Sequence, residues 1–283
     1  MAVEVGRQPC PWRLRPGRED DYPTYARLFT ELGVPEPPPP ATVWAREVAP
    51  RTLLVDGPGG VEGYTSTDVL GALGYVGQLV VAPSARGQGL GRWMMRRVAE
   101  RFREQGCQSW VLNVKRDNAA ALGLYLSLGM KLARQGTSFM VTRAQVAMLP
   151  PVPSGLVVVP LEAGDREPLT QAFGMMPGKL ACYATLPSHR LLRLAREDGE
   201  PGTLGMMDFR SGGAVLYPFF AASLAHARAL LESAFSLLGE ARELVAVVVT
   251  DDVPLERLLR DAGASVSMET FELRGALPES ELP

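Results

Sequence analysis

Short apolar runs and amphipathic stripes alternate along the chain, and turn residues separate them. Leu90, Met94, Val98 and Phe102 recur at every fourth position with arginines between them, which indicates a helix with one buried face. Short apolar runs bounded by Gly, Pro or charged residues indicate strands. The pattern predicts strands at 12–17, 51–57, 61–70, 74–83, 109–114 and 138–143, and helices at 19–33, 42–49 and 117–129 besides the striped one.

Several residues predict where these elements end. Gly33 and Gly106 end two helices, Asp117 or Asn118 caps the helix at 117–129, and Gly129 ends it. The prolines within 34–50 indicate a stiff loop that leads into a short helix.

The order of elements repeats after a stretch without periodicity at 144–155, which we interpret as a linker. Residues 244–264 align with residues 110–130 without gaps, so that Tyr125 falls on Leu259 and Gly129 on Gly263. The repeat predicts an internal duplication into two similar α/β domains, at 1–145 and 146–283.

Composition excludes several classes of function. The 283 residues carry a net charge of −2 and no long basic block, so nothing favours a nucleic-acid partner. The three cysteines form no C-x-x-C pair, and neither histidine has metal-ligand spacing with a cysteine, so we expect no metal and a reducing compartment. The apolar runs are strand-sized, and the first 17 residues lack a signal-peptide core. We therefore expect a cytoplasmic protein without a membrane partner.

The stretch RGQGLG at 86–91 predicts an anion site where a strand gives way to the striped helix. Its glycines let an anion reach the unpaired amides of the first helical turn, and Arg86 and Arg92 add positive charge. The spacing differs from G-x-G-x-x-G, and Arg92 and Trp93 stand where a P-loop needs Lys and Ser or Thr. A pyrophosphate would suit the site.

Residues 79–91, LVVAPSARGQGLG, are similar to the acetyl-CoA-binding motif of the GNAT superfamily of N-acetyltransferases. Residues 118–130, NAAALGLYLSLGM, resemble a second segment of that family, with Met130 in place of Phe. The resemblance covers roughly residues 12–143. It implies an α/β (α+β) fold of two tandem GNAT-like domains, each a mixed, mostly antiparallel twisted sheet flanked by helices, the second without the CoA-binding motif.

The resemblance also implies roles for individual residues. Amides from Gln88 to Arg92 would hold the CoA pyrophosphate, and the backbone of Leu79 and Val81 would pair with the pantetheine arm. Asn118 would bind that arm, although helix capping alone also explains an Asn there. The implied cofactor-binding residues are Leu79, Val80, Val81, Arg86, Gly87, Gln88, Gly89, Leu90, Gly91, Arg92 and Asn118.

Tyr125 is the residue to which the resemblance assigns catalysis, as the acid for the departing thiolate. A phenol has a pKa of about 10 and a thiol about 8.5, so hydrogen bonding alone could stabilise the thiolate. The acceptor amine needs a base, but Tyr75 stands where histone-type members carry Glu. Glu62 and Asp68 on the preceding strand could help, or could be solvated surface carboxylates, so we leave the base unassigned.

The second repeat lacks this chemistry. Phe220, Ser223 and Ala225 align with Arg86, Gly89 and Gly91. The helix stripe falls on Leu224, Arg228, Glu232 and Ser236, or one place earlier on Ser223, Ala227, Leu231 and Phe235, which is more apolar. We expect this half not to bind CoA in the usual way and to have a structural role.

Two functions from different classes follow. The first is an N-acetyltransferase that moves an acetyl group from acetyl-CoA to a small-molecule or peptide amine, by direct attack in a ternary complex and without a metal. The alternative is a non-catalytic sensor or scaffold that binds CoA or acyl-CoA. A dinucleotide-dependent oxidoreductase is disfavoured by the glycine spacing. Either a monomer or a homodimer is compatible with the sequence.

Overall fold

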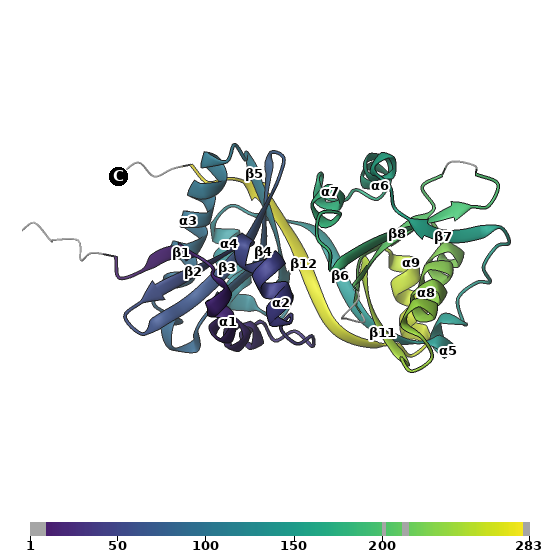
Figure 1. Ribbon diagram of the computed structural model, residues 1–283, viewed down its shortest axis with the longest axis horizontal. Coiled ribbons are helices and arrows are strands. Elements are labelled where there is room, and N and C mark those ends of the chain that lie inside the picture. Colours follow the sequence, from purple (N-terminus) through teal and green to yellow (C-terminus); the bar gives the residue numbers. More distant parts are fainter. Residues whose placement is uncertain (1–9, 200–201, 211–214, 280–283) are drawn as a thin grey trace, which may run out of the picture. The chain divides into compact units, whose positions relative to one another are not determined.

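The computed structural model describes residues 10–199, 202–210 and 215–279 (Figure 1). The chain divides into two compact units. The first comprises Met1–Val69, Gly74–Gly106 and Glu279–Pro283, and the second comprises Leu70–Leu73 and Cys107–Pro278. The predicted boundary at residue 145 concerns the sequence repeat and stays a prediction. The first nine residues, on which the absence of a targeting segment was predicted, lie outside the described residues. Within the described ranges no helix is long and apolar enough to span a membrane.

The first unit contains the strands β1 to β4, in the order β1-β2-β3-β4. β1 pairs antiparallel with β2, and β2 pairs antiparallel with β3. The β4 strand leads directly to the glycine stretch. The bounds are β1 (Arg13–Pro16), β2 (Thr52–Gly57), β3 (Gly60–Leu70) and β4 (Leu73–Val81).

Helices of the first unit follow the predicted positions. Gly33 has a φ of +59°, which confirms it as the end of the first helical segment. The short helix predicted after the prolines is present, but most of it is a π-helical turn at Trp44–Val48 followed by a 3₁₀ turn at Ala49–Arg51. The helices are α1 (Tyr22–Phe29), α2 (Ala41–Val43) and α3 (Leu90–Glu104), with 3₁₀ turns at Glu19–Asp21, Thr30–Leu32 and Pro83–Ala85.

Two apolar clusters hold the first unit together. In one, the rings of Tyr25 and Trp44 stack with centroids 4.2 Å apart, and Tyr64 packs beside them. In the other, Leu90 and Met94 of α3 pack with Val55 and Ala85. All four residues of the predicted α3 stripe are buried. The stripe therefore anchors α3, and with it the turn that precedes the helix.

The second unit contains the strands β5 to β12, in the order β5-β12-β6-β11-β10-β9-β8-β7. β10 and β11 run parallel, whereas the other described pairs are antiparallel. The predicted mixed, mostly antiparallel fold is thereby confirmed. The bounds are β5 (Ser109–Lys115), β6 (Lys131–Thr142), β7 (Leu156–Pro160), β8 (His189–Arg196), β9 (Gly205–Arg210), β10 (Val215–Ala221), β11 (Leu244–Thr250) and β12 (Ser265–Ala276).

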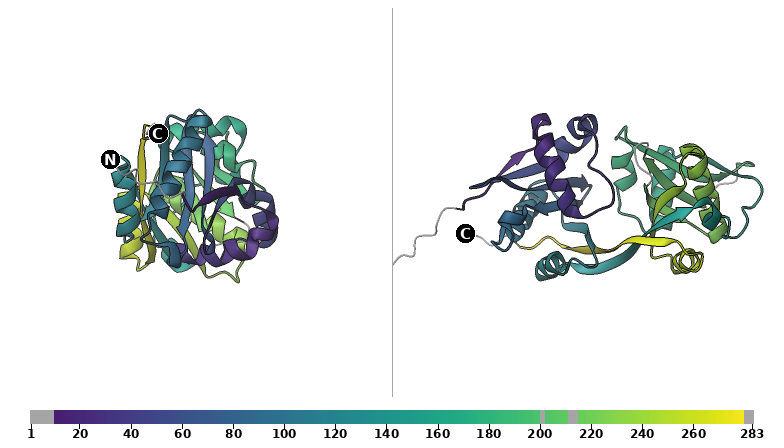
Figure 2. Two further views of the ribbon diagram at one scale, coloured as in Figure 1. Left: turned by 90° about the vertical axis from the view of Figure 1, so that its left-hand side faces the viewer. Right: turned by 90° about the horizontal axis from the view of Figure 1, so that it is seen from below.

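The last strand of each repeat pairs with the other repeat. β12 lies between β5 and β6, and the other edge of β6 pairs with β11 (Figures 1 and 2). Because Glu272 of β12 lies opposite both Asn113 of β5 and Arg134 of β6, three polar residues line up across three strands. The two repeats are therefore joined by backbone hydrogen bonds as well as by the linker.

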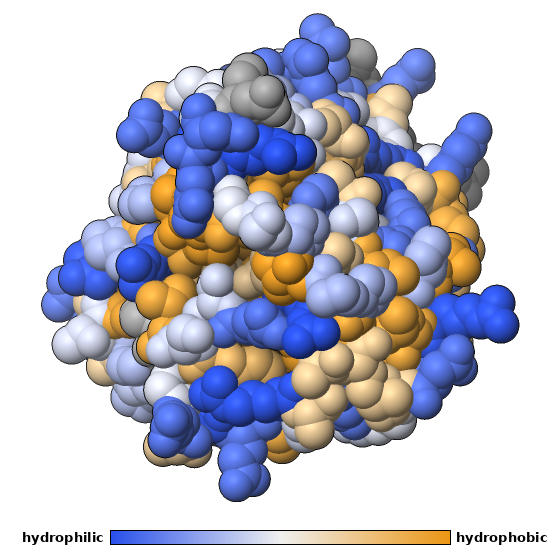
Figure 3. Space-filling view, turned by 90° about the vertical axis from the view of Figure 1, so that its right-hand side faces the viewer, coloured by the Kyte–Doolittle hydropathy of each residue, from blue (hydrophilic) through white to orange (hydrophobic). Residues whose placement is uncertain are grey.

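The helices of the second unit pack mainly through small and branched side chains. Ala227, Leu231 and Phe235 of α8 are buried in the largest core cluster of this unit. On the face drawn in Figure 3, apolar side chains form separate patches among charged ones. The helices are α4 (Ala119–Ser127), α5 (Arg143–Val146), α6 (Arg166–Ala172), α7 (Lys179–Tyr183), α8 (Leu224–Leu238) and α9 (Val253–Asp261).

Two predicted segments differ from the structure. The strand predicted at 138–143 begins much earlier, as β6, because pairing with β12 extends it to Lys131. The predicted linker begins with the helical turn α5, in which Thr142 and Gln145 form a capping box. Four residues show too little periodicity for the pattern to reveal a single helical turn.

Element bounds support the gap-free alignment of the two repeats. α8, α9 and β12 each begin and end 134 residues after α3, α4 and β6. The buried face of α8 instead follows the stripe one place earlier, through Ala227, Leu231 and Phe235. The register of element ends and the register of buried side chains therefore differ by one residue in this helix.

Candidate active site

The turn between β4 and α3 explains two of the three glycines. Gly87 has a φ of +75° and Gly89 a φ of +86°, and both lie exposed. A side chain is strained in this left-handed region, so these two positions favour glycine. Gly91 lies in the first turn of α3 without a left-handed φ, and its lack of a side chain leaves the backbone of that turn bare.

The start of α3 presents unpaired amides. Gly89 is the N-cap residue, and no side chain caps the helix. The first helical hydrogen bond runs from the Trp93 amide to the Gly89 carbonyl at 3.0 Å. Among the described residues, the amides at 88–91 have no backbone acceptor. The helix dipole adds partial positive charge here, so this end of α3 can bind an anion.

Arg86 does not point freely toward such an anion. Its guanidinium forms an ion pair with Glu31 at 2.7 Å, and its Nε donates to the carbonyl of Val81 at 3.2 Å. It therefore ties the turn to the end of β4 and to the segment that follows α1. Arg92 is exposed on the first turn of α3. The positive charge at the site comes from the helix start and Arg92 more than from Arg86.

The end of β4 places the other residues predicted to bind the arm of CoA. Val80 is buried, whereas Leu79 and Val81 are half-buried and pack against the cluster of Leu90 and Met94. Side chains alternate along a strand, which accounts for the buried residue between two partly exposed ones. Leu79–Val81 and the glycine turn are thus brought together in the first unit.

Asn118 and Tyr125 share one helix, α4, in the second unit. Asn118 is its N-cap, and its Oδ1 accepts a hydrogen bond from the Ala121 amide at 3.1 Å. The capping interpretation is therefore observed, and the Nδ2 group remains for other contacts. Tyr125 is buried, and desolvation raises the pKa of its hydroxyl to about 12. Across the part of the chain described, that hydroxyl has no hydrogen-bond partner.

The two carboxylates considered as bases are engaged elsewhere. Asp68 forms a two-oxygen contact with Arg51, at 3.0 and 3.1 Å, and its side chain is only 12% exposed. Glu62 accepts hydrogen bonds from the indole of Trp12 and the amide of Gly59, both at 2.9 Å. Neither is a solvated surface carboxylate, and both stabilise the sheet of the first unit. Tyr75 is buried on β4.

The equivalent position in the second repeat is closed. Ser223 caps α8, and its hydroxyl accepts from the His226 amide at 3.2 Å. Its φ of −157° is extended, so no left-handed turn precedes this helix. Leu259, which aligns with Tyr125, is fully buried in the core. The expectation that this half lacks the usual CoA-binding turn agrees with this geometry.

A buried polar group in the second unit escaped the sequence patterns. Lys179 of α7 is 3% exposed, and its ammonium lies 3.2 Å from the hydroxyl of Tyr217 and 4.4 Å from the centre of that ring. Asn113 donates to the same hydroxyl at 3.4 Å, and the buried Glu272 lies beside Asn113 across the strand pair. These residues come from four separate elements, so only their positions in the fold reveal the group. Within the described ranges, no group of three or more His, Cys, Asp or Glu side chains could hold a metal ion.

Residues 21–130 match the family model described as Acetyltransferase (GNAT) family. This segment therefore carries a GNAT acetyltransferase domain, which confirms the resemblance drawn from the two motifs and implies acyl-CoA-dependent acetyl transfer. A comparison with curated proteins found no significant match.

Solved structures with the same fold include tandem ones. The chain is similar to a GCN5-related N-acetyltransferase from Sphaerobacter thermophilus, with a TM-score of 0.68 at 20% identity over 96% of this chain and 98% of that one. It is similar to a putative acetyltransferase from Pyrococcus horikoshii, with a TM-score of 0.70 at 16% identity over 97% and 92%. A tandem GNAT protein from the clavulanic acid biosynthesis pathway matches with a TM-score of 0.65 at 16% identity over 95% and 100%. At these identities the likeness concerns the fold.

Proposed function

We propose that the protein is an N-acetyltransferase that transfers the acetyl group of acetyl-CoA to an amine by direct attack in a ternary complex. The observation that carries the proposal is the start of α3, where two left-handed glycines and no capping side chain leave amides unpaired and exposed. A diphosphate has the charge and the acceptor oxygens that such amides need. The remaining residues of the proposed CoA site are Leu79, Val80, Val81, Arg86, Arg92 and Asn118.

The proposed reaction needs no metal. The nitrogen of a neutral amine attacks the thioester carbonyl, the C–S bond breaks, and the amine proton leaves as CoA departs as a thiolate that becomes a thiol. Burial holds Tyr125 protonated, with a pKa near 12 against about 8.5 for a thiol. Full proton transfer from Tyr125 is therefore uphill. We assign its hydroxyl the role of a hydrogen-bond donor to the developing thiolate.

The proposed acceptor is a small-molecule or peptide amine. We place the protein in the cytoplasm, because the three cysteines are all free and the reaction consumes acetyl-CoA. We further propose that the two repeats, 1–145 and 146–283, are tandem GNAT-like domains of which the first performs the transfer.

One observation favours a second function, a sensor that binds acyl-CoA without transferring it. Glu62 and Asp68 are both held in structural contacts, so neither is free to deprotonate the acceptor. A sensor would bind CoA through the same glycine turn and would need no base.

Release of thiol from acetyl-CoA over a panel of amines separates the two functions. A transferase releases thiol with at least one amine in the panel, and the rate falls in Tyr125→Phe. Tight CoA binding without turnover on any amine would favour the sensor. Calorimetry that detects no binding of CoA would overturn both.

A further inference from the structure

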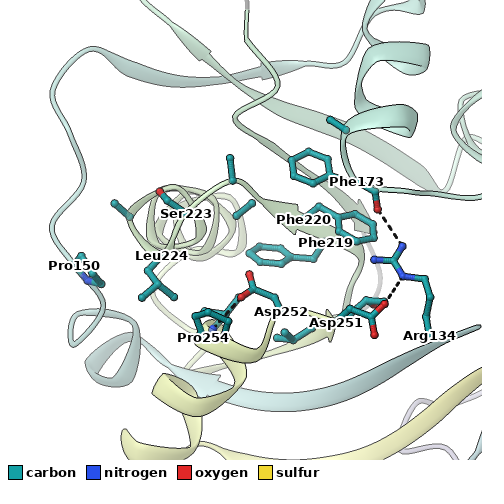
Figure 4. Close-up of a pocket in the computed structure, with 17 residues that line it drawn as sticks. Arg134, Pro150, Phe173, Phe219, Phe220, Ser223, Leu224, Asp251, Asp252 and Pro254 are labelled. Carbon is teal, nitrogen blue, oxygen red and sulfur yellow. Dashed lines mark hydrogen bonds and ion pairs between the residues drawn. The ribbon is translucent and has the colours of Figure 1, made fainter.

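A cleft of about 740 Å³ opens in the second unit, where the strands β10 and β11 diverge (Figure 4). We propose that this cleft is a second ligand site, and that it takes a small molecule with a protonated amino group on an aromatic or branched apolar body. The volume lies within the range of small-molecule sites in proteins. The inference does not depend on the proposed transferase reaction.

Strand geometry creates the cleft. β10 and β11 pair in parallel only at Val215 with Ala246 and at Leu216 with Val247. Beyond Leu216 the register of β10 against β9 shifts, and the strand leaves β11. The lining of the cleft begins just past these pairs, at Phe219 on one strand and Val249 on the other. Its ends are formed by the first residues of α8 and α9.

The cleft is not suited to a diphosphate. Ser223 occupies the first turn of α8 by accepting from the His226 amide. The residues 134 positions after Gly87, Gly89 and Gly91 are Ala221, Ser223 and Ala225, whose Cβ atoms take the place of bare backbone. An anion would also meet the carboxylates of Asp251 and Asp252 in the lining. The site therefore excludes the group that the glycine turn of the first repeat can hold.

The charges in the lining leave one carboxylate uncompensated. The guanidinium of Arg134 pairs with Asp251 at 2.7 Å and donates to the carbonyls of Phe173 and Gly174 at 3.1 and 3.0 Å. The second oxygen of Asp251 accepts from the Gln135 amide at 2.9 Å, so both members of this pair are satisfied. Asp252 accepts only from the Leu255 amide, at 3.0 Å, among the described residues. Figure 4 shows its carboxylate directed into the cleft.

Aromatic walls complete a site for an organic cation. The rings of Phe173 and Phe220 stack with centroids 5.4 Å apart, and Phe219 lies beside them facing Asp252 (Figure 4). Ring faces attract cations, and Arg134 already lies 5.2 Å from the centre of the Phe220 ring. Leu224 and Pro254 close the opposite side with apolar surface. A carboxylate facing aromatic rings across an apolar cleft matches an ammonium group on an apolar body.

The test is calorimetric titration of the full chain with 2-phenylethylamine at pH 7, where this amine is protonated, and with the neutral 2-phenylethanol as reference. We expect saturable binding of the amine and at least ten-fold weaker binding of the alcohol. Asp252→Asn keeps the cap of α9, because Asn caps as well as Asp, but removes the charge. It should weaken amine binding at least ten-fold. Asp261→Asn, at the exposed end of the same helix, should leave it unchanged.

Failure of this proposal is distinguishable from failure of the proposed transferase. No saturable heat with 2-phenylethylamine, or an equal affinity in Asp252→Asn, would overturn the amine site whatever the protein does with acetyl-CoA. Two CoA molecules bound per chain, one of them lost in a Ser223→Trp variant that fills the cleft, would also overturn it. Gly89→Val should leave the amine affinity as it is, and a loss there would place the amine elsewhere.

Discussion

Gly89 and Ser223 occupy the same place in the two repeats and hold opposite conformations. Each is the N-cap of a 15-residue helix, and the two helices begin 134 residues apart. Gly89 has a φ of +86° and no side chain to cap its helix, whereas Ser223 has a φ of −157° and caps its own. One helix start is therefore open to an anion, and the other satisfies its own amides.

This contrast predicts that Gly89→Val weakens CoA binding at least ten-fold. Valine at a φ of +86° costs roughly 1–2 kcal/mol of backbone strain, and relief of that strain moves the amides that would hold the diphosphate. Calorimetry with CoA measures the change. Gly106→Ala is the matched control, because Gly106 has a φ of +81° just past the other end of α3. A loss of CoA affinity in the control as large as in Gly89→Val would attribute the effect to α3 as a whole.

Tyr125→Phe should lower the rate of acetyl transfer by about 10²-fold and leave the affinity for CoA nearly unchanged. The hydroxyl is buried without a partner in the described chain, so its removal deletes a donor and no structural hydrogen bond. With a pKa raised to about 12, Tyr125 stays protonated below about pH 10, and the wild-type rate should show no decline from its ionisation up to that pH. Steady-state rates from pH 6 to 10 check both statements, with Tyr22→Phe as the control. Equal rates in wild type and Tyr125→Phe would remove Tyr125 from the mechanism.

Asp21 should make the fold sensitive to acid. Arg15 donates to both of its carboxylate oxygens at 2.7 Å, and these hydrogen bonds lower the pKa of Asp21 below its value in an unfolded chain, about 3.9. A lowered pKa contributes stability that is present above the unfolded value and is lost as the pH falls through the folded one. Urea unfolding at pH 7 and pH 3 should therefore show a smaller loss in Asp21→Asn than in wild type. Asp20→Asn, exposed in the same turn, should behave like wild type, and an identical loss in all three proteins would refute the assignment.

Leu231→Ala tests the register of α8. Leu231 is fully buried, so the substitution should lower the free energy of unfolding by about 2–5 kcal/mol. Leu237→Ala on the same helix, at a side chain that is 41% exposed, should cost less than about 1 kcal/mol. Denaturant unfolding measures both. Similar costs for the two variants would mean that α8 buries a different face.

Local patterns were enough for the elements that carry the proposed CoA site. The spacing of Leu90, Met94, Val98 and Phe102 predicted α3 and its buried face, and Asn118 was predicted as a cap and is one. The glycines at 87 and 89 predicted an unusual turn, and both are left-handed. These features depend on residues within one or two turns of each other, where backbone sterics and hydrogen bonding decide the conformation.

Partners distant in sequence were decided by the tertiary structure. No pattern in the sequence indicates that β12 enters between β5 and β6, so the alignment of Asn113, Glu272 and Arg134 appears only in the fold. The one-residue shift in the buried face of α8 depends on what packs against that helix, and the cleft beside Phe219 depends on where β10 leaves β11. Strand exchange, helix rotation and the opening of a cleft are set by packing between segments more than a hundred residues apart. The sequence determined where an anion can bind, and the tertiary structure decided where a second, oppositely charged ligand can.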